Sequence, residues 1–193
     1  MPTSWEDLTN PAYEGLIQAP TPQASGTAYN IVASLVTMMG EDEAFAYMTR
    51  LNDNIQTYTS SGTGPSKGVA VGQCAIGIQF TPAFFQFISE GYPLEVVFPS
   101  EGVGFEAPGV SIIKGAKNLD AAKTLVDWLV SKEGQDVLSE ENTFFYPVNP
   151  EATLADGMPA FESLKTVPID IQWAGTNKTR LVERWVDEVL GAK

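Results

Sequence analysis

Apolar residues recur at intervals of three and four along four stretches of the chain. These stretches are residues 27–39, 41–51, 118–130 and 177–190. The apolar positions that set the intervals include Val32, Leu35, Phe45, Met48, Leu125, Leu129, Leu181 and Trp185. Such spacing puts apolar side chains on one face of a helix, so it predicts four amphipathic helices. Asn118 is placed to cap the third of them.

Shorter apolar runs lie between and around these helices. They are residues 15–19, 75–79, 94–98 and 110–113. Their length and their β-branched residues predict four strands. Another helix is expected from Pro82, because proline fits the first helical turn. Since strands and helices alternate, the order predicts an α/β fold with a largely parallel or mixed sheet flanked by helices.

Small polar residues stand at three junctions between a predicted strand and a predicted helix. The first junction is Ser25-Gly26-Thr27, which follows a Pro-rich turn and opens a helix. A helix N-terminus has unpaired backbone N–H groups and the positive end of the helix dipole, so hydroxyl residues and glycine there can bind an anion. The same residues are also typical of an ordinary helix cap.

The second junction is the loop at residues 60–65, with the sequence SSGTGP. Such a loop can wrap a ligand with backbone and hydroxyl donors, or it can be a flexible connection. It is not a nucleotide-binding P-loop, because Lys67 does not stand in the required order. The third junction is residues 79–81, where side chains reach the crevice of an α/β sheet. The candidate ligand residues are Ser25, Gly26, Thr27, Ser61, Gly62, Gln79 and Thr81.

Charge and residue types argue against several other functions. The net charge is −13, from 24 acidic and 11 basic residues, and such a surface repels a nucleic-acid backbone. There is no His, which removes the commonest catalytic base and metal ligand. The single Cys74 lies in an apolar stretch and is expected to be a buried, inert thiol. The adjacent acids at 41–43 and 140–141 are interpreted as solvated surface, so no metal, cofactor or catalysis is expected.

Four segments of the chain have a distinctive order and spacing. They are TSWEDLTNPAYEGLIQAPTPQASGTAY at 3–29, YTSSGTGPSKGVAVGQCAIGI at 58–78, VVFPSEGVG at 96–104 and SIIKGAKNLDAAKTLVDWLVSKEGQ at 111–135. Together they cover most of the chain. They resemble the C-terminal portion of the family 1 extracellular solute-binding proteins, a group that includes ferric-iron, 2-aminoethylphosphonate and hexose-phosphate binders.

The resemblance implies a periplasmic-binding-protein-like (type II) fold, in which two α/β lobes close by a hinge on a ligand in the cleft between them. It implies the substrate-binding component of an ABC importer and not an enzyme. Such a component is periplasmic or extracellular and is held at the membrane through the transporter permease. The resemblance carries residues 25–27 onto an anion-binding turn, residues 61–62 onto a second ligand loop, and residues 79 and 81 onto a position after a strand.

The ferric members of the family carry two adjacent iron-ligating tyrosines at that last position. Here the aligned residues are Thr81 and Pro82, and the nearby Phe84 and Phe85 have no phenol oxygen. Fe(III) needs anionic oxygen ligands, so a small anionic solute, a phosphonate or a phosphate ester, is favoured over iron. Iron or an iron chelate is the alternative within the family.

The resemblance also divides the chain. It implies that residues 1–108 with 162–193 form the second, C-terminal lobe, and that residues 109–161 belong to an incomplete first lobe. The signal and the N-terminal lobe are expected to be absent from this chain, so its expected protein partner is the missing first-lobe segment or a second copy. Two other classes stay open: a phosphate-ester hydrolase on the same sheet, which would need a general base, and an interaction module with a non-functional cleft.

Overall fold

The computed structural model describes residues 1–192 of the 193-residue chain. These residues divide into two compact units. One unit comprises Met1–Phe105 together with the chain from Leu164 onward, and the other comprises Glu106–Ser163. The first unit contains all three of the junctions at which the sequence places small polar residues.

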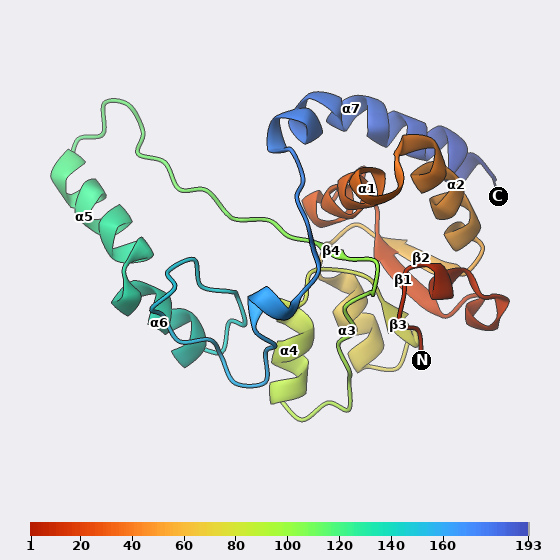
Figure 1. Cartoon of the computed structure of the whole chain (residues 1–193), viewed down its shortest axis with the longest axis horizontal. Helices are drawn as coiled ribbons and strands as arrows, with labels where there is room; N and C mark the ends of the chain where they lie inside the picture. Colours follow the sequence, from red (N-terminus) through yellow and green to blue (C-terminus); the bar gives the residue numbers. More distant parts are fainter. Residues whose placement is uncertain (193) are drawn as a thin grey trace. The chain divides into compact units, whose positions relative to one another are not determined.

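A parallel sheet of three strands forms the centre of the first unit (Figure 1). The strands are β1 (Ile17–Pro20), β2 (Ile55–Thr59) and β3 (Ile76–Gly77), in the order β2-β1-β3. Ile17 of β1 pairs with Ile55 on one side and with Ile76 on the other. All four residues of β1 are buried, as expected for the middle strand of a parallel sheet with helices on both faces.

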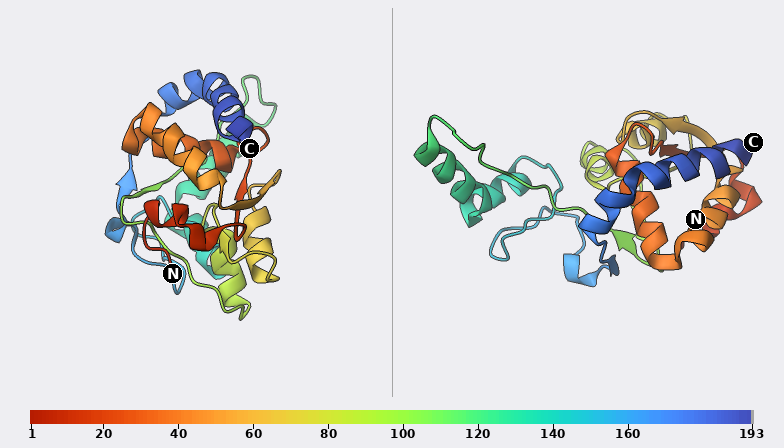
Figure 2. Two further views of the ribbon diagram at one scale, coloured as in Figure 1. Left: turned by 90° about the vertical axis from the view of Figure 1, so that its right-hand side faces the viewer. Right: turned by 90° about the horizontal axis from the view of Figure 1, so that it is seen from above.

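Helices cover the sheet on both sides. Three of them, α1 (Gly26–Met39), α2 (Glu41–Asn52) and α7 (Ile171–Glu188), lie above it in Figure 1. The short α3 (Gly64–Ala70) and α4 (Pro82–Ser89) lie below it. Both views in Figure 2 show α7 lying along α1 and α2, although α7 is far from them in sequence.

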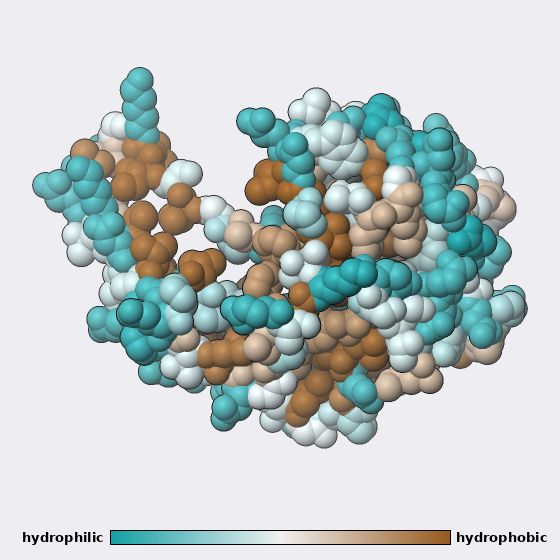
Figure 3. Space-filling view, in the orientation of Figure 1, coloured by the Kyte–Doolittle hydropathy of each residue, from teal (hydrophilic) through white to brown (hydrophobic). Residues whose placement is uncertain are grey.

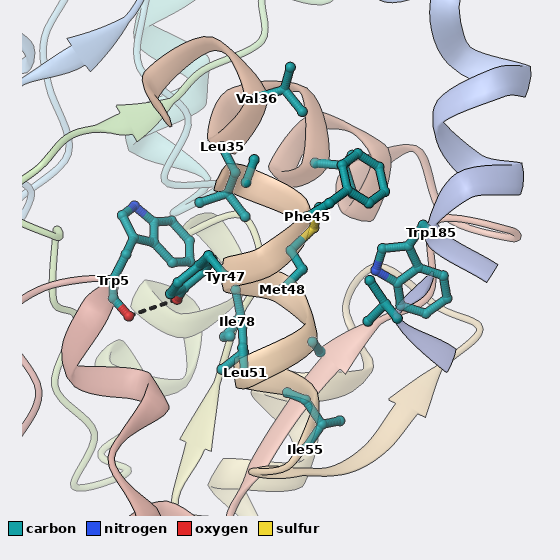
Figure 4. Close-up of a cluster of buried hydrophobic side chains, with 14 of the residues drawn as sticks. Trp5, Leu35, Val36, Phe45, Tyr47, Met48, Leu51, Ile55, Ile78 and Trp185 are labelled. Atoms are coloured by element: carbon teal, nitrogen blue, oxygen red, sulfur yellow. Dashed lines mark hydrogen bonds between the residues drawn. The ribbon is translucent and has the colours of Figure 1, made fainter. Parts of the chain in front are cut away.

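The main hydrophobic core lies where α1, α2 and α7 meet the sheet (Figure 4). Its most deeply buried side chains include Ile17, Leu35, Phe45, Tyr47, Leu181 and Val189. The Tyr47 hydroxyl donates to the carbonyl of Trp5 at 2.7 Å, so this phenol is satisfied inside the core. Burying one Leu or Phe side chain contributes about 1.5–3 kcal/mol, and the core is therefore the main source of stability in this unit.

Charged and polar contacts fix α7 to α2. Arg184 lies 2.8 Å from Glu41 and 3.0 Å from Asp42, and its guanidinium stacks 4.3 Å from the ring centre of Phe45. The amide of the buried Asn52 donates to the Val189 carbonyl at 2.8 Å. These contacts hold the C-terminal helix on the unit that the first half of the chain builds.

A second, very short parallel pair lies at the edge of the first unit. It joins β4 (Val103–Gly104) to β5 (Thr166–Val167), next to the two points where the chain passes between the units. The Trp5 indole donates to the Gly102 carbonyl at 2.9 Å, which ties the N-terminal segment to β4.

The second unit is helical among its described residues. It contains α5 (Leu119–Val130), α6 (Lys132–Glu140) and the short 3-10 turn η3 (Phe161–Ser163). Ser131 caps α6 by accepting a hydrogen bond from the Gly134 backbone at 3.1 Å. No residue of α5 is buried, and apolar side chains gather on the exposed face of this unit in Figure 3.

The structure confirms the α/β class and corrects parts of the expected element list. Residues 94–98 and 110–113 are not strands, since neither segment pairs with a neighbour in the described chain. Asn118 precedes α5 without a capping hydrogen bond from its side chain. The strand β2 was not predicted. Every strand pair among residues 1–192 is parallel, so the alternative of a mixed sheet is wrong for these residues.

Candidate anion-binding site

The N-terminus of α1 is formed by the first polar junction. Ser25 has extended backbone angles and precedes the helix, and its Oγ accepts a hydrogen bond from the Ala28 backbone at 3.4 Å. Ser25 is only 7% exposed, whereas Gly26 is exposed and Thr27 is half-buried. The first turn of α1 holds no acidic residue, so nothing in it opposes an anion at the positive end of this 14-residue helix.

The second polar junction forms a tight turn between β2 and α3. The Thr59 hydroxyl donates to the Ser61 carbonyl at 2.8 Å, and the Thr63 backbone donates to Ser61 Oγ at 3.3 Å. The hydroxyls of Ser61 and Thr63 lie 3.2 Å apart. These bonds link Ser61 to Thr59 and Thr63 and give the loop a defined shape.

The two junctions meet because β1 and β2 are neighbouring parallel strands. The Thr21 backbone donates to the Thr59 carbonyl at 2.9 Å, which continues the pairing beyond the strand ends. At Gly62 the approach is so close that an added Cβ would lie 2.5 Å from Thr27 Oγ1 and 2.9 Å from Ser25 Oγ. Two hydroxyls of the first junction and the backbone of the second therefore lie together in the first unit.

The third junction supports the start of α3, the helix that follows the second loop. Gln79 Oε1 accepts from the Ser66 backbone at 2.8 Å, and its Nε2 donates to the Phe80 carbonyl at 3.3 Å. Both ends of this amide are thus occupied by backbone groups. Thr81 stands at the start of α4, where its carbonyl accepts from Phe84 at 2.9 Å. Gln79 reaches the N-terminal turn of α3, and Thr81 belongs to the start of α4.

Two titratable side chains of the first unit, Tyr29 and Cys74, keep their protons at neutral pH. Burial raises the pKa of the Tyr29 phenol above its ordinary value, and this hydroxyl donates to the Ala174 carbonyl in the first turn of α7. Burial also raises the pKa of the Cys74 thiol. A buried, protonated thiol is a poor nucleophile and a poor metal ligand.

Residues 1–192 contain no group of three or more Cys, Asp or Glu side chains placed to hold an ion. Phe84 and Phe85, which the resemblance puts near the tyrosines of the ferric members, are both buried.

An open cavity of about 710 Å³ lies elsewhere on the first unit. Its lining residues are Glu6, Thr9, Pro11, Glu14, Arg50, Asp53 and Asn54. Three carboxylates against one guanidinium make this cavity unfavourable for an anion. Hydrogen-bond donors and hydroxyls at the N-terminus of α1 fit an anion better.

The model of a bacterial extracellular solute-binding protein family matches residues 1–171. The chain belongs to this family. Its members bind solutes and are not enzymes. No helix within residues 1–192 has the length and apolar character of a membrane span.

Individual proteins also match this solute-binding protein over nearly its whole length. An uncharacterized protein of Haemophilus influenzae is 40% identical over the whole of this chain, which covers 57% of that relative. The periplasmic binding protein AfuA from Actinobacillus pleuropneumoniae, solved with exogenous fructose 6-phosphate bound, is 40% identical with a TM-score of 0.90. The match covers 98% of this chain and 60% of AfuA. The chain therefore spans less than two thirds of the length of these relatives.

More distant relatives differ in the solutes that their names give. The phosphoglycerate transport regulatory protein PgtC of Salmonella typhimurium is 26% identical over 77% of this chain and 37% of its own length. The Fe(3+)-binding periplasmic protein of Serratia marcescens is 23% identical over 95% of this chain and 55% of its own length. The Bordetella ferric binding protein, at 19% identity and a TM-score of 0.75, shares the fold.

Some residues of the site escaped prediction from the sequence. Thr59 shapes the second loop, and Thr21 joins this loop to the first junction. A signal was present for Thr59, because it extends the run of hydroxyl residues at 60 and 61. No local signal marks Thr21, whose role depends on the pairing of β1 with β2.

Proposed function

We propose that this protein is the solute receptor of an ABC importer and that it binds a small anionic solute, a phosphonate or a phosphate ester. One observation carries the proposal: Ser25, Thr27 and Gly62 come together at the N-terminus of α1, with Gly26 exposed beside them. Family membership supports a binding role, and AfuA, at 40% identity, was solved with a sugar phosphate.

The proposed chemistry needs only neutral donors. Backbone N–H groups at Gly26 and Thr27 would point along the helix axis toward an oxyanion, and the hydroxyls of Thr27 and Ser61 would add further donors. The dipole of α1 favours negative charge at this end. The donors are held by β1, β2 and the bonds of the 60–63 loop, so they need little reorganisation when an anion arrives.

The remaining roles follow from the same proposal. The receptor would act in the periplasm or outside the cell and would deliver its solute to a transporter permease. Residues 1–108 with 162–193 would form its second lobe, and residues 109–161 would belong to its first lobe.

Iron is the competing solute, because several relatives are named for it. In this chain Thr81, Pro82, Phe84 and Phe85 offer no phenolate where the ferric members carry tyrosines. Direct coordination of Fe(III) at these positions is therefore not part of the proposal.

A thermal-shift screen of the complete gene product tests the proposed solute class. The panel contains phosphonates, sugar phosphates, inorganic phosphate, ferric citrate and a polyamine. We expect stabilisation by one or more of the phosphorus oxyanions, since a ligand at one hundred times its Kd stabilises by about 2.7 kcal/mol. Stabilisation by ferric citrate alone, with a visible charge-transfer band that survives substitution of Tyr29 and Tyr58, would show that the solute is iron and would contradict the proposed anion.

A further inference from the structure

The N-terminal segment of the chain is bonded to residues 100–102, which lead into β4. The Ser100 backbone donates to the Thr3 carbonyl at 3.1 Å. The Trp5 indole donates to the Gly102 carbonyl at 2.9 Å, and Trp5 is only 8% exposed. A hydrogen bond between buried groups is costly to open, because both groups lose their partner away from water.

Glu101 adds a bridge between the same two segments. One of its carboxylate oxygens accepts from the Trp5 backbone at 3.1 Å, and the other accepts from the Glu6 backbone at 3.2 Å. Such charge-assisted bonds are stronger than bonds between neutral groups. These four bonds, which join residues 3–6 to residues 100–102, are called the N-terminal clasp below.

The strand that follows the clasp is packed against α1. The Val103 backbone donates to the Lys165 carbonyl at 2.9 Å, next to the pairing of β4 with β5. An added Cβ on Gly104 would lie 1.9 Å from Ser34 Oγ, so the backbone of β4 lies directly on the helix. Ser34 is 2% exposed, and its hydroxyl donates to the Asn30 carbonyl at 2.7 Å. The clasp therefore ends beside the helix that carries the candidate anion site.

We propose that the N-terminal clasp is a conformational device that keeps β4 against α1, just before the chain leaves the first unit after Phe105. The inference rests on the proposed function and on the lobe closure that the resemblance implies. A fixed strand at the start of the crossing leaves fewer conformations for solute binding to order. Opening the clasp therefore weakens solute binding, although the clasp residues are not among the candidate ligand residues.

Asp7 provides a matched control for Glu101. Its Oδ2 accepts from the backbones of Thr3 at 2.7 Å and of Ser4 at 3.2 Å, so it also binds two N–H groups of the N-terminal segment. These bonds stay within that segment. Glu101→Gln and Asp7→Asn thus each remove one negative charge and disturb one pair of backbone bonds, but only Glu101→Gln acts on the clasp.

Amide hydrogen exchange in the 193-residue chain tests the structural part of the inference. Glu101→Gln should speed exchange of the Val103 amide by about tenfold or more, because the new NH₂ group cannot accept from a backbone N–H. Asp7→Asn should change this rate by less than about threefold. Trp5→Phe, which removes the indole N–H and keeps an aromatic ring, should act in the same direction as Glu101→Gln. An unchanged Val103 rate in both clasp variants would overturn the inference.

Calorimetric titration of the complete gene product with inorganic phosphate, methylphosphonate and fructose 6-phosphate tests the functional part. Glu101→Gln should raise the Kd of the oxyanion that binds by about threefold to tenfold, and Asp7→Asn by less than about twofold. An equal rise in both variants would contradict the inference, because it would trace the effect to the lost charge.

Failure of the inference and failure of the proposed function are distinguishable. If the unsubstituted protein binds an oxyanion and Glu101→Gln binds it equally well, the clasp has no role in solute capture and the proposed function stands. If the unsubstituted protein binds none of the three probes, the proposed function fails, and the exchange rate of Val103 still decides whether the clasp holds β4.

Discussion

Two helices with the same apolar spacing, α1 and α5, differ completely in burial. Seven residues of α1 are buried, and no residue of α5 is. Leu35 on α1 is 1% exposed, whereas Leu125 on α5 is 56% exposed. Spacing therefore specifies which side of a helix is apolar, and burial depends on whether another element covers that side.

The difference also bears on function. Helix α1 contacts β1, α2 and α7, so residues from both ends of the chain hold it in place. The candidate anion site stands on this well-supported helix. A binding site needs such support, because donors that move lose affinity to the cost of ordering them.

The largest difference in stability is expected between alanine variants of the two leucines. Leu35→Ala should lower the free energy of unfolding by about 2–5 kcal/mol, since it leaves a cavity in a packed core. Leu125→Ala should change it by less than about 0.5 kcal/mol. Urea denaturation followed by circular dichroism measures both. An equal loss for Leu125→Ala would mean that α5 is covered in solution.

The rates of amide hydrogen exchange should also differ between α1 and α5. Central amides of α1 should exchange at least about 100-fold more slowly than those of α5 in the 193-residue chain, because local opening of an uncovered helix costs little. Light scattering on the same sample reports its mass. Protected α5 amides in a dimer would identify a second copy as the cover, while protected α5 amides in a monomer would contradict the comparison.

A smaller effect concerns the ion pairs that fix α7 to α2. Hydrogen bonds from Arg180 and Arg184 lower the pKa of Glu41 from 4.5 to about 2. Because the pKa is depressed in the folded protein, this carboxylate stabilises the fold above pH 4.5 and the contribution is lost as the pH falls toward 2. After allowance for solvent screening, the contribution is about 1 kcal/mol.

Glu41→Gln isolates that contribution. It should reduce the loss of stability between pH 5 and pH 3, whereas Glu90→Gln, at an exposed position after α4, should leave the loss unchanged. Thermal melts across this pH range measure the difference. Identical curves for Glu41→Gln and the unsubstituted protein would show that the ion pairs contribute nothing.

Local patterns predicted the helices better than the strands. The apolar intervals of α1 and α2 match the buried residues, and the run at 15–19 predicts the buried β1 within two residues. The apolar pattern did not predict strand β2, because β2 lies at the edge of the sheet and its residues Gln56 and Thr57 are exposed. The runs at 94–98 and 110–113 look like strands, but a strand needs a paired neighbour and sequence alone does not supply one.

The candidate site was only partly predictable for the same reason. Ser25, Gly26 and Thr27 are recognisable at the start of a helix, because the cap has a local signal. The contact between Gly62 and those hydroxyls joins residues about 35 positions apart and depends on the parallel pairing of β1 with β2. The support that Gln79 gives to α3 depends likewise on the packing of β3.

The central claim is that the N-terminus of α1 binds an anion, and calorimetric titration of a paired variant tests it most directly. In the complete gene product, Ser25→Ala with Thr27→Val should weaken the phosphorus oxyanion selected by the screen by about 1–3 kcal/mol, the range for hydrogen bonds to a charged group. Thr37→Val is the control, because its hydroxyl donates to Ala33 on the same helix, away from the site. Unchanged affinity in the Ser25/Thr27 variant would contradict the claim and would leave both residues as helix caps.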